Sequence, residues 1–87
     1  MTCEDIDRIC RKLTSKLVRE SWSSLERAYI LCLLGTAVRH ATDGEYGEAL
    51  NIIEYVGDVM LALGECSREE ILEIDAFIRE GRLVAQA

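Results

Sequence analysis

Four short motifs divide the chain almost completely, and each is a signal for the start of an α-helix. In each motif a Ser or Thr stands three residues before an Asp or Glu: Thr2–Asp5, Ser23–Glu26, Thr42–Glu45 and Ser67–Glu70. In such a capping box the hydroxyl accepts a hydrogen bond from the third helical N–H, and the carboxylate accepts one from the N–H of the capping residue. An apolar pair flanks the first and last motifs, Met1 with Ile6 and Cys66 with Ile71. The motifs therefore predict four helices of about 12 to 20 residues each.

Apolar residues recur at helical spacing between these motifs and give the helices approximate limits. They predict helices over residues 3–18, 24–41, 44–63 and from 67 to Gly81, the expected C-cap glycine. Residues 28–34 are apolar nearly all round, which predicts that the second helix is the most enclosed one; if it is exposed, another subunit or a partner has to cover it. Gly47 and Gly57 each cost about 1 kcal/mol in a helix, so each is expected to allow close approach of another helix.

The fold class follows from this pattern together with the composition. The chain has 87 residues, 49% of them hydrophobic, and contains no Pro. We expect one all-α domain over residues 1–87, either a four-helix bundle or two stacked helical hairpins. A domain of this size buries only about 60–65% of its unfolded surface, so association through an apolar face, including a homo-oligomer, fits the pattern.

Charge is unevenly distributed and limits the partners. Residues 1–42 carry seven basic and five acidic side chains, a net charge of +2, whereas residues 43–87 carry three basic and eleven acidic ones, a net charge of −8. The acidic half disfavours direct contact with nucleic acid or an anionic membrane. It is either a solvated surface or a surface complementary to a basic partner or to the basic first helix of another copy. The longest apolar run has seven residues, too short to span a membrane.

Residues that could carry chemistry do not form a recognisable motif. Cys3, Cys10, Cys32 and Cys66 contain no C-x-x-C pair, and Cys32 lies in the most apolar run. Because no secretory signal segment is present, we expect reduced, buried thiols and a cytoplasmic location. The lone His40 has no second ligand or catalytic partner nearby in the sequence, and we expect it near a helix C-terminus. We therefore expect no enzyme activity, no metal and no cofactor.

One segment resembles a known family. The pattern Gly44-x-Tyr46-x-x-Ala49-Leu50-x-x-Ile53-x-x-Val56 resembles the second helix of a tetratricopeptide repeat, with Ala37 and Leu33 standing where its first helix has a small and a bulky residue. The match covers residues 30–63. It departs from the family at Thr36 and Val56, where an apolar residue and Ala are usual, and no Pro closes the unit. The resemblance implies a tight hairpin closed at Gly44.

The same resemblance implies a protein-binding module rather than an enzyme. Small proteins of this kind include the chaperones that hold helical substrates for type III secretion. They capture a partner's amphipathic helix in a groove between hairpins. We therefore expect a small chaperone, adaptor or assembly factor that binds another protein.

Six apolar and aromatic residues are the candidates for partner binding: Trp22, Tyr29, Leu33, Tyr46, Ile53 and Tyr55. Trp22 precedes a helix cap, where it either closes one end of the core or anchors a partner. Tyr29 and Tyr55 lie off the main apolar stripes and are expected to be exposed. The alternative function is a small acidic inhibitor, such as phages encode, whose acidic half mimics nucleic acid and blocks a nucleic-acid-binding machine.

Overall fold

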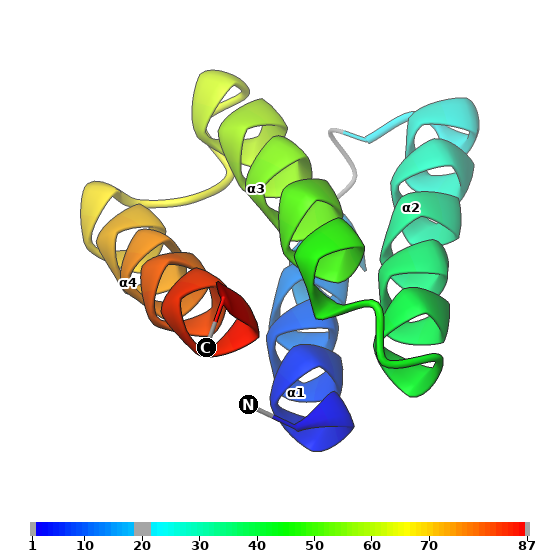
Figure 1. The fold of residues 1–87 in the computed structure, drawn as a ribbon. Helices are drawn as coiled ribbons and strands as arrows, with labels where there is room; N and C mark the ends of the chain where they lie inside the picture. The colour runs from blue at the N-terminus through cyan, green and yellow to red at the C-terminus, as the bar shows by residue number, and fades with distance from the viewer. Residues whose placement is uncertain (1, 19–21, 87) are drawn as a thin grey trace.

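The computed structural model describes residues 2–18 and 22–86 and is built from helices (Figure 1). Its elements are α1 (Cys3–Thr14), a 3-10 helix η1 (Ser15–Val18), α2 (Ser24–Thr42), α3 (Tyr46–Ala62) and α4 (Arg68–Gln86). These described ranges contain no β-strand. The all-α prediction with four helices is confirmed, and the last turn of the first predicted helix is tightened into η1.

Three of the four predicted capping boxes form. In each, the hydroxyl accepts from the backbone N–H three residues on, while the carboxylate accepts from the N–H of the capping residue. The two distances are 3.3 and 2.9 Å for Thr2–Asp5, 3.1 and 3.0 Å for Ser23–Glu26, and 3.2 and 3.0 Å for Ser67–Glu70. Cys66 and Ile71, the predicted apolar pair at the last box, are both buried. Met1, predicted to pair with Ile6, lies outside the described residues.

The fourth predicted capping box, Thr42–Glu45, is wrong. Thr42 is the last residue of α2, and its hydroxyl donates to the carbonyl of Val38 at 3.0 Å. The chain leaves the helix through Gly44, two residues later, which has φ +80°. The Gly44 N–H donates to the Ala41 carbonyl at 3.1 Å, and the Glu45 N–H donates to the His40 carbonyl at 2.8 Å. This Schellman arrangement satisfies the end of α2. Helix α3 then begins after Glu45 without a side-chain cap.

The turn between α3 and α4 uses the same stop. Gly64 has φ +75°, its N–H bonds to the Leu61 carbonyl at 3.1 Å, and the Glu65 N–H bonds to the Met60 carbonyl at 2.8 Å. Only a residue that tolerates positive φ fits this position without strain, which is why glycine stands at both turns. Among the described glycines positive φ is confined to these two. The predicted stop at Gly81 is therefore wrong, and α4 continues through it to Gln86.

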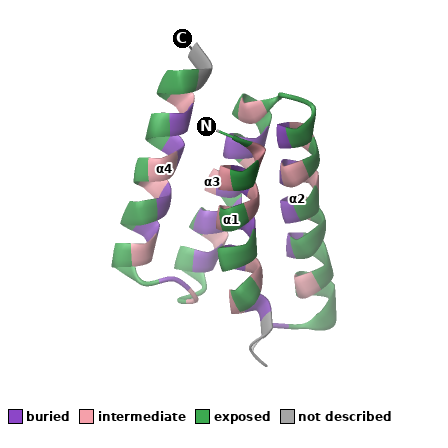
Figure 2. Cartoon of the chain, turned by 90° about the horizontal axis from the view of Figure 1, so that it is seen from below, coloured by how far each residue is buried: buried purple, intermediate pink, exposed green. Residues whose placement is uncertain are grey.

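Helix α3 is the centre of the arrangement. It lies between α2 and α4, while α1 packs against α2 and also touches α3 (Figure 1). Consecutive helices run antiparallel, and their buried residues face inward (Figure 2). The prediction that residues 24–41 form the most enclosed helix is wrong, because α2 lies at the edge and exposes Leu25, Tyr29 and Leu31. We also predicted that, if this helix is exposed, another subunit or a partner has to cover its apolar face, and α2 is exposed in this way.

The core consists of the apolar stripes of all four helices. Its fully buried members include Ile6, Leu13, Leu50, Ile53, Val56, Met60 and Ile78. Gly57 is buried, and a Cβ built on it would lie 3.7 Å from Ile74, so its predicted place against another helix is confirmed. Gly47 is exposed with nothing within 4 Å of such a Cβ, so the same prediction for Gly47 is wrong.

Ion pairs join α4 to α1, η1 and α3, beside the buried contacts of its isoleucines. Lys12 pairs with Glu73 at 2.7 Å, and Lys16 pairs with Glu70, joining α1 and η1 to α4. The two terminal guanidinium nitrogens, Nη1 and Nη2, of Arg82 donate hydrogen bonds to the two carboxylate oxygens of Glu54 on α3, at 3.1 and 3.2 Å. The Lys16 contact holds the pKa of Glu70 down to about 2, helped by the Ser67 backbone. Several acids of the C-terminal half are thus partnered by basic side chains.

Candidate functional site

Helices α2 and α3 lie close together at their connecting turn and diverge towards the opposite end (Figure 1). Near the turn, the buried residues include three small ones, Ala37, Ala41 and Ala49. The larger side chains of Trp22, Tyr29 and Tyr55 lie at the opposite end. Small buried side chains thus contribute to the closed end, and large aromatic ones surround the open end.

A hollow of about 390 Å³ lies between the diverging ends. It is lined by Trp22, Leu25, Glu26, Tyr29 and Ile30 from the α2 side and by Tyr55, Val59 and Leu63 from the α3 side. A smaller hollow of about 100 Å³ shares Trp22, Glu26 and Leu63 with it and adds Glu65. We call these two hollows and their nine lining residues the Trp22 groove.

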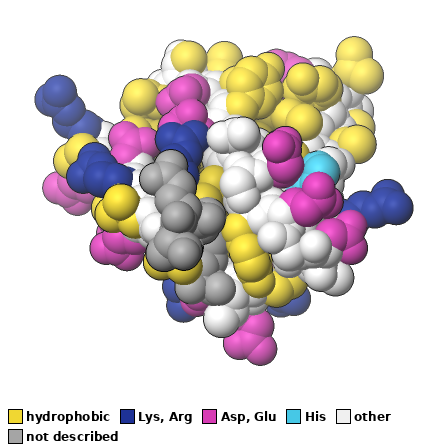
Figure 3. Space-filling model, in the orientation of Figure 1, with side chains coloured by type: hydrophobic (Ala, Val, Ile, Leu, Met, Phe, Trp, Pro, Cys, Tyr) yellow, Lys and Arg dark blue, Asp and Glu magenta, His cyan; other side chains and the backbone are white. Residues whose placement is uncertain are grey.

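The walls of the Trp22 groove carry apolar side chains that are exposed to solvent. Leu25 is 82% exposed, and Tyr29, Tyr55 and Leu63 are each about half exposed. Hydrophobic side chains gather on the upper part of the molecule, over the ends of α2 and α3 (Figure 3). Single exposed apolar residues are common on proteins, but a contiguous set around a hollow is typical of an interaction site.

Trp22 is a buried residue of the groove. It is only 5% exposed and belongs to the core, which confirms the prediction that it closes one end of it. Its indole Nε1 is buried and has no hydrogen-bond acceptor among the described residues. A buried N–H without an acceptor costs about 1–3 kcal/mol, so the unpaired indole N–H makes this end of the core less stable than it would be with an acceptor.

Tyr29 and Tyr55 face one another from the two walls of the groove. A side-chain hydrogen bond with Tyr55 raises the pKa of Tyr29 above its ordinary value. Both side chains keep about half of their surface in solvent, as predicted from their positions off the main stripes. The pair therefore bridges α2 and α3 while leaving aromatic surface available for contact.

The structure divides the six predicted partner-binding residues into two sets. Trp22, Tyr29 and Tyr55 lie together in the groove. Leu33 and Tyr46 are partly buried and pack against the core, and Tyr46 lies nine residues before Tyr55, about 13 Å along α3. Ile53 has no exposed surface at all, so its assignment as a contact residue is wrong. Its place in the apolar stripe of α3 explains its burial.

Sequence reasoning missed several lining residues, among them Leu25, Val59 and Leu63. Val59 and Leu63 follow Tyr55 at spacings of four and eight, and Leu25 precedes Tyr29 by four. These spacings extend each tyrosine into an apolar row on its own helix. The sequence therefore contained the information needed to find these residues. The row on α2 ends at Tyr29 and the row on α3 begins at Tyr55, and both tyrosines were predicted to lie off the core stripes.

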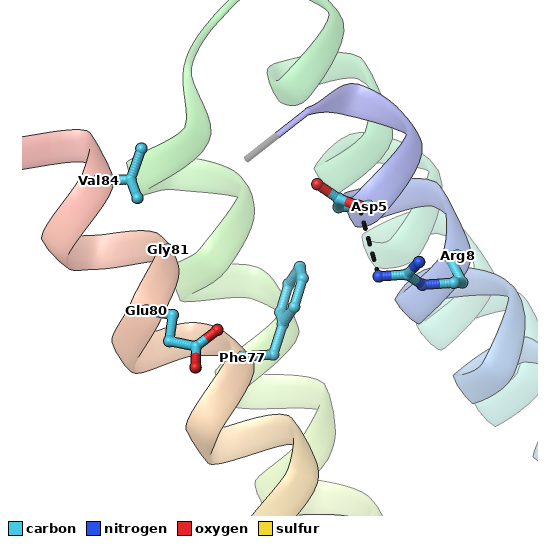
Figure 4. Close-up of a pocket in the computed structure, with 6 residues that line it drawn as sticks. All are labelled: Asp5, Arg8, Phe77, Glu80, Gly81 and Val84. Atoms are coloured by element: carbon cyan, nitrogen blue, oxygen red, sulfur yellow. Dashed lines mark hydrogen bonds and ion pairs between the residues drawn. The ribbon is translucent and has the colours of Figure 1, made fainter.

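A second hollow, of about 280 Å³, lies between α1 and α4 (Figure 4). Phe77 projects from α4 towards α1, and Glu80, Gly81 and Val84 line the α4 side. On the α1 side Asp5 and Arg8 pair with each other at 3.4 Å. Because these two charges already satisfy one another and the lining is mixed, this hollow offers a weaker basis for recognition than the Trp22 groove.

Residues suited to metal binding or catalysis are scattered. No group of three or more His, Cys, Asp or Glu side chains within the described ranges could hold a metal ion. The four cysteines are free thiols, and burial raises the pKa of Cys10 to about 12. Cys32 is exposed on α2, so the expectation that it is buried is wrong. His40 lies near the C-terminus of α2, as predicted, with its Nδ1 3.3 Å from Glu45.

The chain was compared with known protein families, curated proteins and solved structures. No protein-family model, no curated protein and no solved structure matches the chain. The tetratricopeptide resemblance therefore stays a prediction, although the hairpin has the buried Ala37 and Ala49 and the turn at Gly44 that it implies. The helices of the described ranges are also too short or too polar to cross a membrane.

Proposed function

We propose that this protein is a non-catalytic binding module that holds an amphipathic helix of another protein in the Trp22 groove. The observation that carries this proposal is the exposed apolar lining of the groove between α2 and α3. Leu25 and Tyr29 form one wall, and Tyr55, Val59 and Leu63 form the other. A chaperone, adaptor or assembly factor acting in the cytoplasm is the class of protein that needs such a surface.

The dimensions and composition of the groove suit a helix. The row from Tyr55 to Leu63 covers eight residue steps, about 12 Å, which matches two turns of a docked helix. Two antiparallel walls with a third helix laid between them repeat the packing of an ordinary helical core. A partner helix would contact them through apolar residues spaced at three and four. Tyrosines suit such contacts because they add large area at little cost in side-chain entropy.

The placement of charge does not favour the alternative function, an acidic inhibitor that mimics nucleic acid. Such a mimic needs a continuous array of unpartnered negative charge. In the C-terminal half, Glu70 and Glu73 pair with Lys16 and Lys12, and Glu54 pairs with Arg82. These contacts interrupt the acidic surface of α3 and α4.

Capture of partners from a native lysate with groove variants and a matched control tests the proposal. Leu25→Asp and Tyr55→Ala change the groove walls, whereas Leu72→Asp changes a leucine on α4 that is 62% exposed and lies outside the groove. We expect one partner to be retained in high salt by the wild type and by Leu72→Asp. With the purified partner, Tyr55→Ala is expected to weaken binding about 30-fold, corresponding to about 2 kcal/mol.

Three results would contradict the proposal. Equal binding of the partner by the wild type and by both groove variants would place the contact elsewhere. A concentration-dependent dimer in sedimentation that Leu25→Asp abolishes, without any other partner, would make the groove a self-association face. A partner released by moderate salt from all variants alike would favour the acidic-inhibitor alternative.

A further inference from the structure

The apolar walls of the Trp22 groove are accompanied by acidic side chains. Glu26 lines the groove, and no Lys or Arg is found among its lining residues in the described part of the chain. Helix α3 has no basic residue, and of its acids Glu54 is paired with Arg82 and Glu48 lies in the first turn, away from the groove. Asp58 is exposed and stands three residues after Tyr55, so it lies beside the α3 wall.

Glu26 remains anionic because it belongs to a capping box. Its carboxylate accepts from the Ser23 backbone N–H at 3.0 Å, and this bond lowers the pKa of Glu26 below its ordinary value. The carboxylate also lies at the N-terminus of α2, where the helix dipole favours negative charge. A group next to the groove therefore meets a fixed negative charge at neutral pH.

A second copy of the chain is a poor match for this surface. A symmetric dimer brings the same patch together from both subunits, so Glu26 and Asp58 would meet the acidic side chains of an identical patch. The basic helix α1 of another copy offers no better match, because its apolar residues Ile6, Cys10 and Leu13 are buried. Charge complementarity therefore favours a helix from a different protein.

We propose that the partner helix carries Lys or Arg residues on both sides of its apolar stripe, placed to lie beside Glu26 and Asp58. This inference rests on the proposed function and adds the charge of the partner to it. The apolar stripe fills the groove between Tyr29, Tyr55 and Leu63, and the basic flanks meet the acidic rim. A helix with acidic residues on its flanks is repelled by Glu26 and Asp58. These two residues therefore select among amphipathic helices that share the same apolar stripe.

Selection from a displayed library of helical peptides tests the inference without a known partner. The peptides share a fixed leucine stripe with three- and four-residue spacing and have random residues at the flanking positions. Clones that bind the wild type and Leu72→Asp but not Leu25→Asp are groove-dependent. We expect Lys and Arg to outnumber Asp and Glu clearly at the flanks of these clones. Their binding is then measured by the fluorescence of Trp22, the only tryptophan in the chain.

Charge-removing variants make the test quantitative. Glu26→Gln keeps a capping-box residue while removing its charge, and Asp58→Asn does the same at the α3 wall. Together they are expected to weaken basic-flanked peptides about 3- to 10-fold at low salt, and this factor should approach one at high salt. Glu48→Gln, near the opposite end of α3, is the matched control and should leave binding unchanged.

The outcomes separate the two proposals. Groove-dependent clones without a charge preference, or unchanged affinity in the double variant, overturn the inference and leave the proposed function standing. A selection that yields no groove-dependent clone overturns the proposed function and the inference with it.

Discussion

The two ends of the α2–α3 hairpin differ although the same pair of helices forms both. At the turn end, buried alanines and Leu50 pack the helices together. At the open end, Leu25, Tyr29, Tyr55 and Leu63 stand around a groove with much of their surface in solvent. Both ends are lined by apolar side chains, so what distinguishes them is how far these side chains are buried. Alanines contribute to the closed end, and the larger side chains at the open end leave room for a further helix.

The largest expected contrast comes from the same substitution at the two ends of α3. Leu50→Ala removes a fully buried side chain and is expected to lower the free energy of unfolding by about 2–5 kcal/mol. Leu63→Ala at the open end should cost well under about 1 kcal/mol, because half of the side chain is already exposed. Urea denaturation followed by circular dichroism measures both. Equal losses would show that the open end is part of the core.

A smaller contrast is expected when the alanines are enlarged. Ala49 has no exposed surface, so Ala49→Leu should overpack the closed end and destabilise the fold by about 1–3 kcal/mol. Ala62→Leu on the exposed side of α3 should change stability by no more than about 0.5 kcal/mol. Thermal unfolding of the two variants compares them. A tolerated leucine at Ala49 would contradict the idea that small side chains close this end.

The turn that closes the hairpin should respond oppositely to alanine at two neighbouring glycines. Gly44→Ala forces a Cβ into positive φ and is expected to destabilise by about 1 kcal/mol. Gly47→Ala, in the first turn of α3 with open space around it, should stabilise by about 0.5–1 kcal/mol. Chemical denaturation of both variants checks the signs. If both substitutions changed the free energy of unfolding in the same direction, the positive φ at Gly44 would not be what distinguishes this turn.

The smallest effect concerns the response of the hairpin to acid. At the open end α2 begins with a capping box, whereas α3 begins at the turn end without one. The folded-state pKa of Glu26 is lowered from its ordinary value of 4.5. Its contribution to stability is therefore present above pH 4.5 and is lost as the pH falls further. Glu26→Gln should be less stable than the wild type at about pH 6 and should approach it at about pH 3 in urea titrations.

A second variant separates the two hydrogen bonds of the capping box. Ser23→Ala removes only the hydroxyl that accepts from the Glu26 N–H, and it should cost about 1 kcal/mol near neutral pH. The Glu26 carboxylate keeps its bond from the backbone N–H of residue 23, so Glu26→Gln added to Ser23→Ala should still cause most of the pH-dependent difference that it causes in the wild type. Loss of this difference in the Ser23→Ala background would show that the hydroxyl, and not the backbone N–H, lowers the pKa of Glu26.

Local chemistry made most of the fold predictable from the sequence. Three capping boxes and the stripe spacing located the four helices within a few residues. The Thr42 box failed because a capping hydroxyl must lie outside the preceding helix, and the Gly44 stop keeps Thr42 inside it. Gly81 failed for the converse reason, since a glycine ends a helix only where the chain adopts positive φ. Neither point can be decided from residue spacing alone.

The site was predictable only in part. Tyr29 and Tyr55 were recognisable because they lie off the core stripes, but Ile53 belongs to a stripe and is buried. The edge position of α2 depends on how four helices are arranged in space, which the apolar run at residues 28–34 does not specify. Only this arrangement turns Leu25 and Leu63 into walls of one groove.

The groove is built without the last helix. Its lining residues lie between Trp22 and Glu65, and α4 begins only at Arg68. Helix α4 covers the other side of α3, at Gly57, and does not contribute to the groove. A transient opening of α4 therefore removes no lining residue from the binding surface.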